Sequence, residues 1–194
     1  MEKQRAASER RREAILNAAI SIFSRYGFKK TSLEDIADAA GISKQGLYLY
    51  FKGKEDIFRA ANEKYLRDGL RYMENELERN DISLQEKIYN AIDAWFGRHL
   101  LTFQPSSLDV LDARNDLPGM TNDIAIYKNV ICAKIAAVLE GSPEFSQLRN
   151  ARTPAEIADV LFMCGLSWKD AEGSHEKFME DMAICIKVCC QFQE

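Results

Sequence analysis

The chain is poor in residues that interrupt helices, and it lacks long apolar runs. Its only prolines among 194 residues are Pro105, Pro118, Pro143 and Pro154. The first hundred residues can therefore form helices interrupted only by glycines and capping residues. No stretch approaches the roughly 18 consecutive apolar residues of a membrane span. The charged N-terminus also lacks the apolar run of a secretory signal. We therefore expect a cytoplasmic protein without a membrane segment.

Cysteine and histidine are also scarce, and the common catalytic motifs are missing. The five cysteines form an odd set without the spacing of a disulfide framework, which favours reduced thiols. The only histidines are His99 and His175. The sequence contains no HExxH, P-loop, GxSxG or GxGxxG pattern. We expect no enzyme, no metal site and no cofactor.

Charge is distributed unevenly along a chain that has enough apolar residues for a core. Apolar residues make up 46% of the sequence, and the net charge is −4. Residues 1–56 contain eleven Lys or Arg against eight Asp or Glu, whereas the remainder contains fifteen against twenty-two. A basic end on an acidic body suggests that one end contacts a polyanion. The boundary between a domain of residues 1–56 and one of residues 57–194 is expected near this change.

Apolar residues recur at helical spacing along the chain, and no segment shows the alternation of a strand. The residues Thr31-Ser32-Leu33-Glu34 have the form of a capping box, and Gly27 and Gly41 are natural helix stops. Helices are expected at about 8–26, 31–40, 44–50, 55–79, 83–103, 107–114, 121–140, 154–171 and 174–192. The predicted fold is all-α, with an N-terminal three-helix domain and a larger helical domain.

Residues 31–50 have the pattern of a helix-turn-helix, with the turn at residues 41–43. An ordinary αα-hairpin has the same pattern, but the side chains here favour DNA. The polar residues Lys44, Gln45, Tyr48, Tyr50, Lys52 and Lys54 lie within eleven residues, and no acidic residue occurs among them. Lysine and tyrosine donate to phosphate oxygens, and Gln45 can read an adenine edge. Gly46 leaves space for the backbone to approach DNA.

The stretch TSLEDIADAAGISKQGLYLYFKGKE, residues 31–55, resembles the DNA-binding domain of the TetR family. The preceding helix fits as well, with ILNAA at 15–19 and FSRYGF at 23–28, so the resemblance covers about residues 9–58. It implies that Thr31 contacts phosphate and that residues 44–46 face the major groove. It also implies that Tyr48, Tyr50 and Lys54 hold the DNA backbone. The predicted DNA-binding residues are Thr31, Ser32, Ser43, Lys44, Gln45, Gly46, Tyr48, Tyr50 and Lys54. Leu49 departs from the family, which commonly has a histidine or an aromatic residue there.

Two C-terminal helices have apolar faces wider than one neighbour within the chain requires. A helix-turn-helix protein reads two half-sites as a dimer, so a dimerising surface is expected. The resemblance implies that these two helices pair with their counterparts in a second copy. The predicted interface residues are Ala158, Leu161, Gly165, Trp168, Phe178, Met182, Cys185 and Cys189.

The central segment is expected to hold a pocket for a small apolar or aromatic ligand, if the chain follows the family. Candidate lining residues are Trp95, His99, Phe103, Met120, Tyr127 and Trp168; the alternative is that they form core. The resemblance implies a repressor that binds operator DNA. The ligand would release the repressor from DNA by favouring a state in which the two DNA-binding domains of the dimer have a different spacing. A thiol-based redox sensor using Cys185, Cys189 and Cys190 is the alternative, although buried cysteines commonly act as small hydrophobes.

Overall fold

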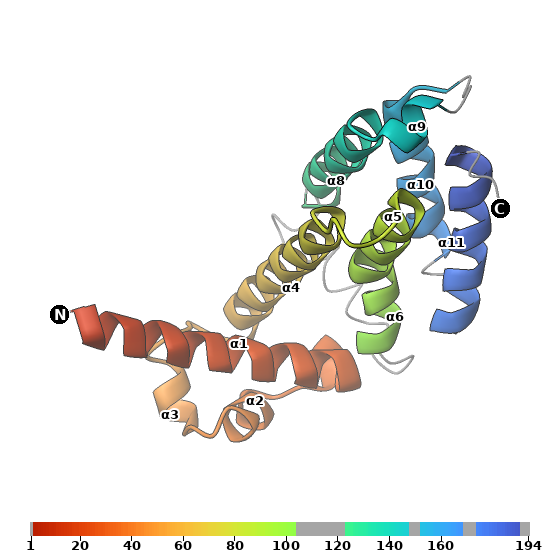
Figure 1. Ribbon diagram of the computed structural model, residues 1–194. Helices are drawn as coiled ribbons and strands as arrows, with labels where there is room; N and C mark the ends of the chain where they lie inside the picture. Colours follow the sequence, from red (N-terminus) through yellow and green to blue (C-terminus); the bar gives the residue numbers. More distant parts are fainter. Residues whose placement is uncertain (1, 104–122, 148–151, 169–173, 191–194) are drawn as a thin grey trace. The chain divides into compact units, whose positions relative to one another are not determined.

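The computed structural model describes residues 2–103, 123–147, 152–168 and 174–190, which contain helices and turns but no β-strand. The chain forms two compact units, shown in Figure 1. The N-terminal unit comprises Met1–Arg67 and the segment that begins at Thr102, and the C-terminal unit comprises Asp68–Leu101 and Asn122–Glu194. The predicted all-α fold is confirmed. The predicted domain boundary at residue 56 stays a prediction. In the described ranges, no helix combines the length and hydropathy that a membrane crossing needs.

The N-terminal unit contains α1 (Glu2–Lys30), α2 (Leu33–Ala39), α3 (Lys44–Leu47) and the first half of α4 (Lys54–Leu77). Of the two glycines predicted as stops, Gly27 lies at a kink within α1 and Gly41 lies in the turn between α2 and α3. Gly27 has a φ of 83° and Gly41 a φ of 66°, left-handed values that side chains with a Cβ rarely adopt. Helix α2 packs against both α1 and α3, and Figure 1 shows α2 and α3 on the same side of α1.

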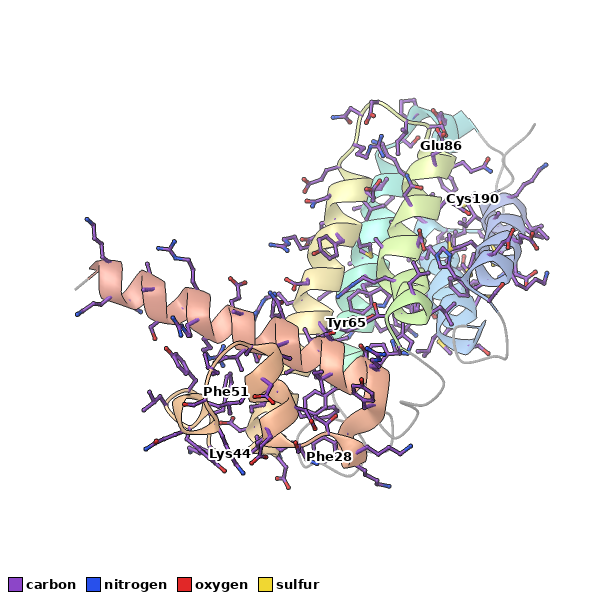
Figure 2. All side chains as sticks on the ribbon, turned by 90° about the horizontal axis from the view of Figure 1, so that it is seen from below. Phe28, Lys44, Phe51, Tyr65, Glu86 and Cys190 are labelled. Atoms are coloured by element: carbon purple, nitrogen blue, oxygen red, sulfur yellow. The ribbon has the colours of Figure 1, made fainter. Side chains whose placement is uncertain are left out.

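A compact apolar core holds these helices together. Its most buried members come from all four helices and from the link between α3 and α4: Ile15, Leu16, Ala19, Phe23, Ile36, Ala37, Leu47, Phe51, Ile57, Phe58 and Ala61. Because α3 has only four residues, it cannot be stable as an isolated helix. Its position is fixed by Leu47, which is fully buried, and by the buried Phe51, which follows α3 in the chain and is labelled in Figure 2.

The C-terminal unit contains the rest of α4 and the remaining helices. They are α5 (Leu84–Ile92), the π-helical turn η1 (Asp93–Gly97), α6 (Arg98–Thr102), α8 (Asp123–Glu140), α9 (Pro143–Gln147), α10 (Pro154–Trp168) and α11 (His175–Cys190). Most predicted helices are found within a few residues of their expected ends. The short helix α9, which begins with a proline, was not predicted. The predicted helix at 107–114 lies outside the described residues.

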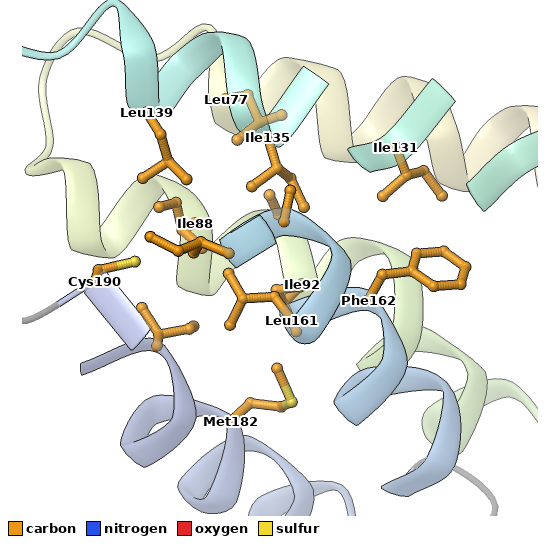
Figure 3. Close-up of a cluster of buried hydrophobic side chains, with 14 of the residues drawn as sticks. Leu77, Ile88, Ile92, Ile131, Ile135, Leu139, Leu161, Phe162, Met182 and Cys190 are labelled. Atoms are coloured by element: carbon orange, nitrogen blue, oxygen red, sulfur yellow. The ribbon is translucent and has the colours of Figure 1, made fainter. Parts of the chain in front are cut away.

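A second apolar core fills the C-terminal unit. Helix α10 packs against α8 and α11, and α11 also packs against α5. Figure 3 shows the side chains that these helices contribute. The fully buried ones include Ile88 and Ile92 from α5, Ile131 and Ile135 from α8, and Leu161 from α10.

Several residues predicted for the dimer interface lie in this core, and the prediction is wrong for their side chains. Ala158, Leu161, Phe178 and Met182 are all at most 4% exposed. Cys185 and Cys189 are half-buried and pack against the same core. The four buried residues face neighbouring helices of their own chain, so they cannot also face a second copy without unpacking, whereas the interface prediction stays open for Cys185 and Cys189. The side chain of Trp168 lies outside the described residues.

Gly165, which was predicted for the dimer interface, also serves the interior of the chain. A Cβ built at Gly165 would lie 2.6 Å from two carbons of the Phe96 ring. The ring is itself buried and makes an edge contact with Phe162, with centroids 5.3 Å apart. The glycine therefore makes room for an aromatic side chain of the same core.

Gly165→Ala is expected to destabilise the C-terminal unit. Inserting one methyl group into a packed core costs about 1–3 kcal/mol, which exceeds the roughly 1 kcal/mol that alanine gains in helix propensity. Urea unfolding followed by circular dichroism measures the difference. The double variant Gly165→Ala/Phe96→Leu is the control, because the smaller side chain relieves the overlap and should lose less than the two single changes added together. A Gly165→Ala protein as stable as the wild type would contradict this role.

A π-helical turn lies among the residues predicted to line one ligand pocket. Trp95, His99 and Phe103 are spaced for one face of a regular helix, but η1 contains wider turns and the helix ends at Thr102. Trp95 stacks on Tyr127 of α8 with ring centroids 5.3 Å apart. Phe103 instead belongs to the N-terminal unit, where it packs on Tyr65. That these three residues line one pocket stays a prediction. Met120 lies outside the described residues.

Candidate nucleic-acid interface

The start of α2 is capped one residue later than the sequence suggested. Ser32 is the N-cap: its hydroxyl accepts a hydrogen bond from the backbone N–H of Asp35, and the Asp35 carboxylate accepts one from the Ser32 backbone N–H at 2.8 Å. These two bonds form the capping box that we had placed on Thr31 and Glu34. Because the backbone N–H and hydroxyl of Ser32 bind the charged carboxylate, they lower the pKa of Asp35.

Thr31 points into the protein, away from the surface where a phosphate contact was predicted. Its side chain is 3% exposed, and its hydroxyl donates a 2.6 Å hydrogen bond to the carbonyl oxygen of Gly27. The hydroxyl therefore satisfies a carbonyl where α1 breaks and cannot reach a DNA backbone outside. For this residue the predicted phosphate contact of the side chain is wrong, and the adjacent Ser32 is the exposed hydroxyl residue.

Helix α3 begins at Ser43, whose hydroxyl accepts a hydrogen bond from the Gly46 N–H at 3.0 Å. This cap leaves the first turn of α3 at the surface, where Lys44, Gln45 and Tyr48 are exposed. Gly46 and Tyr50 are half-buried, because the opposite side of the segment carries Leu47 into the core. Of the predicted groove-facing residues, Lys44 and Gln45 thus lie on the exposed side of one short helix, and Gly46 is half-buried beside them.

Lys44 is held at the surface by an ion pair with α2. Its ammonium donates to the carboxylate of Glu34 at 2.5 Å, and both side chains are well exposed. The hydrogen bond lowers the pKa of Glu34 and raises that of Lys44. An exposed pair of this kind contributes little to stability. The Lys44 ammonium can therefore exchange the carboxylate for a phosphate oxygen, and Figure 2 shows this residue at the edge of the unit.

Lys54 has a different environment from the other lysines of the predicted interface. Its ammonium donates 2.9 Å hydrogen bonds to the carbonyl oxygens of Phe28 and Thr31, and it lies 4.5 Å from the centroid of the Phe28 ring. These contacts tie the start of α4 to the link between α1 and α2. Lys54 thus has a structural role that the sequence did not indicate, besides any contact with DNA.

Leu49 is the residue of this surface that the sequence reasoning left without a role. It is 82% exposed directly after α3, next to the exposed Tyr48. Apolar side chains in this position can contact the methyl group of thymine in the major groove. The sequence contains a pattern that could have predicted this role. Leu49 is a large apolar residue within a run of polar ones, at a position where helical spacing does not require it for the core.

The cysteines give the redox alternative no support. The Sγ atoms of Cys185 and Cys189 lie 3.9 Å apart on α11. Burial, reinforced by the neighbouring Cys189, raises the pKa of Cys185 far above its usual range, and burial raises the pKa of Cys190 to about 12. Thiols in this environment stay protonated near neutral pH, whereas reaction with oxidants requires the thiolate. Within the described part of the chain, no group of three or more His, Cys, Asp or Glu could hold a metal ion.

Comparison with known proteins links the N-terminal helices to one family. The family model described as bacterial regulatory proteins, tetR family, matches residues 15–61. An uncharacterized HTH-type transcriptional regulator, YfiR of Bacillus subtilis, is 36% identical over 74 residues, which are 38% of this chain and 36% of that protein. The HTH-type transcriptional regulator RutR of Escherichia coli is 44% identical over 59 residues, 30% of this chain and 28% of RutR. The matches thus cover about a third of each relative.

Solved structures resemble the chain over nearly its whole length. A transcriptional regulator from Cytophaga hutchinsonii has a TM-score of 0.70 at 22% identity, over 92% of this chain and 96% of that one. A TetR-like transcriptional regulator from Rhodococcus has a TM-score of 0.59 at 24% identity, over 94% and 97%. At these identities the likeness concerns the fold. The helix-turn-helix with its two serine caps falls within residues 15–61, the part of the chain that matches the model of the tetR family of bacterial regulatory proteins.

Proposed function

We propose that the protein is a transcriptional regulator that binds operator DNA as a homodimer and represses until a small molecule releases it. The observation that supports DNA binding most directly is the exposed side of α3, with Lys44, Gln45 and Tyr48 at the surface. A helix-turn-helix needs this side free to enter the major groove. An enzymatic role has no support from the family match, and the cytoplasmic location stays a prediction.

The exposed residues divide into two roles by their chemistry. Lys44, Tyr48 and the exposed Lys52 after it carry donors suited to phosphate oxygens, which set the register on DNA. Gln45 carries both a donor and an acceptor, the pair that an adenine edge presents in the major groove. We therefore assign base reading to Gln45 and positioning on the backbone to the lysines and to Tyr48.

Gln45→Ala is expected to relax sequence preference at particular base pairs. The operator is first identified by selecting bound duplexes from a random DNA pool. Losing a bidentate contact costs about 1–3 kcal/mol in discrimination, so affinity for the selected site should fall by roughly 5- to 150-fold while non-specific binding stays the same. Lys52→Ala is the matched control, because it should weaken all duplexes alike and reduce the salt dependence. Identical effects of the two changes, or no site selected at all, would refute the proposal.

Leu49→Ala is expected to remove a contact with a thymine methyl group. Affinity should fall for the selected operator but change little for the same operator with deoxyuridine at the thymine that Leu49 contacts, because uracil lacks the methyl. Wild-type protein should lose affinity on that base change by a similar factor, roughly 2- to 5-fold, corresponding to the burial of about one methyl group. If Leu49→Ala and the deoxyuridine changes are additive at every thymine of the site, Leu49 does not read a methyl group.

The dimer is proposed to form through exposed apolar residues of α10 and α11. Val160 and Met163 are exposed three residues apart on α10, and Ile184 and Val188 are exposed four residues apart on α11. The two helices pack against each other within the chain. Large exposed apolar residues that recur along a helix favour a protein partner. Pairing of two copies through these helices would complete the four-helix interface expected from the family.

Features of the C-terminal unit support release by a ligand. Of the predicted pocket residues, Trp95 and Tyr127 stack on each other in the C-terminal unit, and His99 is half-buried on α6. These support an aromatic-lined site there. A ligand acts on DNA binding only if it binds the two states with different affinities. A small apolar or aromatic compound that binds the C-terminal unit tightly without changing operator affinity would refute this mechanism.

A further inference from the structure

The early turns of α1, residues 3–14, extend beyond the core of the N-terminal unit. All of their side chains are exposed except that of Arg12, which is half-buried. Burial on α1 begins at Ile15, and the family model matches from the same residue onward. Figure 1 shows this end of the helix extending past α3. We call residues 3–14 the extension; neither the core nor the family match gives it a role.

One face of the extension continues the side of α1 that packs on the core. Residues three, four or seven apart lie on the same face of a helix. The buried residues Ile15 and Ala19 lie four apart on the core side. At the same spacing they are preceded by Arg12, Ser8 and Arg5. The side of α1 that is apolar along the core therefore carries two arginines and a serine beyond it.

Arg12 joins this face to the candidate nucleic-acid interface. Its guanidinium carbon lies 5.0 Å from the centroid of the Phe51 ring. Phe51 follows the half-buried Tyr50 and precedes the exposed Lys52, whose side chains both carry donors for phosphate oxygens. Arg5 lies seven residues before Arg12, which is about 10.5 Å along the helix axis. The extension thus carries cations outward from the edge of the helix-turn-helix.

The composition of the extension fits a polyanion. Residues 2–14 contain five Lys or Arg against three Glu, and their only apolar members are three alanines. Docking on a protein or on a membrane surface uses large apolar side chains, which this segment lacks. One of the carboxylates, that of Glu13, is directed to α4, where it lies 3.6 Å from the ammonium of Lys64. Cations at a fixed spacing on a helix suit a row of phosphates.

We propose that the extension binds the phosphate backbone of the duplex that flanks the operator, and that Arg5 makes the outermost contact. Each DNA strand carries one phosphate for about 3.4 Å of duplex, so the distance between Arg5 and Arg12 corresponds to at most about three base pairs. Such contacts raise affinity without reading sequence. The inference rests on the proposed function and extends the bound DNA beyond the base pairs that the helix-turn-helix reads.

Arg5→Ala is tested on two duplexes that contain the selected operator. One carries about one helical turn of flanking DNA on each side, and the other is trimmed to the selected base pairs. On the long duplex, the slope of log affinity against log salt should fall by about 1.8, which is 0.9 for each copy in the dimer. Between about 50 and 200 mM salt, the wild type should therefore lose roughly tenfold more affinity than the variant. On the trimmed duplex the two slopes should agree.

Arg10→Ala is the matched control. Arg10 is exposed and lies two residues from Arg12, on the opposite side of the helix. Its replacement removes the same charge from the extension and should leave both slopes unchanged. Arg5→Lys should restore the wild-type slope, because a phosphate contact needs the charge and not the guanidinium shape. Unchanged helical content by circular dichroism shows that each variant remains folded.

Three results would overturn the inference alone: an unchanged slope for Arg5→Ala on the long duplex, an equal loss on both duplexes, or an equal loss for Arg10→Ala. The second would place the contact within the operator, and the third would mean that only the net charge of the extension matters. In each of these cases the wild type still binds its operator, so the proposed function stands. If the wild type selected no DNA, the proposed function and this inference would both be overturned.

Discussion

Ile184→Glu should leave each copy folded and prevent two copies from pairing. The side chain is 62% exposed on α11, so the carboxylate meets water in the single chain at little cost. In a dimer built on this face it would be buried against a second copy without a partner, which costs several kcal/mol. We expect a dimer-to-monomer change in sedimentation velocity and unchanged helical content by circular dichroism.

Loss of the dimer should carry a large cost in DNA binding. Two linked DNA-binding domains bind about 10²- to 10⁴-fold more tightly than one, because binding of the first raises the effective concentration of the second at its half-site. The Ile184→Glu protein should therefore lose at least about a hundredfold in affinity for a two-half-site operator, and little for a single half-site. Ile126→Glu is the matched control, since Ile126 is equally exposed, at 60%, but lies on α8. A variant at Ile184 that still sediments as a dimer would show that the interface lies elsewhere.

The same helix shows why the sequence predicted the wrong face. Both α10 and α11 have apolar residues around much of their circumference, so spacing alone does not tell which ones face a neighbour in the same chain. Met182 and Ile184 are two residues apart, yet one is fully buried and the other exposed. Which residues of α11 are buried is determined by α5 and α10, which pack on this helix. This is long-range information that a helical period does not contain.

The sequence predicted helix stops and caps more reliably, because residues close together in the chain determine them. Gly27 and Gly41 were predicted as helix stops because only glycine adopts left-handed backbone angles without strain, and both have positive φ values. The capping box was predicted in the right place but in the wrong register. Thr31 and Ser32 both fit the motif, and burial of Thr31 against α1 decided between them. The π-helical turn at Asp93–Gly97 left no recognisable mark on the sequence, so the positions of Trp95, His99 and Phe103 could not be inferred.

Lys54→Met is expected to destabilise the N-terminal unit by about 2 kcal/mol, the typical loss for a charged donor that serves partly buried acceptors. Methionine retains most of the aliphatic chain but leaves the carbonyls of Phe28 and Thr31 without the ammonium. The lysine also loses its favourable position over the Phe28 ring. Thermal and urea unfolding, followed by fluorescence or circular dichroism, measure this change.

Lys52→Met separates this structural role from a phosphate contact. Lys52 is exposed two residues away, so its replacement should change the free energy of unfolding by less than about 0.5 kcal/mol. It should instead reduce the slope of log affinity against log salt by about 0.9, the value for one phosphate contact. Lys54→Met, measured where it is fully folded, should keep the wild-type slope, because the carbonyls already engage its ammonium. If Lys54→Met lowers the slope without changing the unfolding, then Lys54 contacts phosphate after all, and its bonds to the carbonyls are exchanged for that contact on DNA.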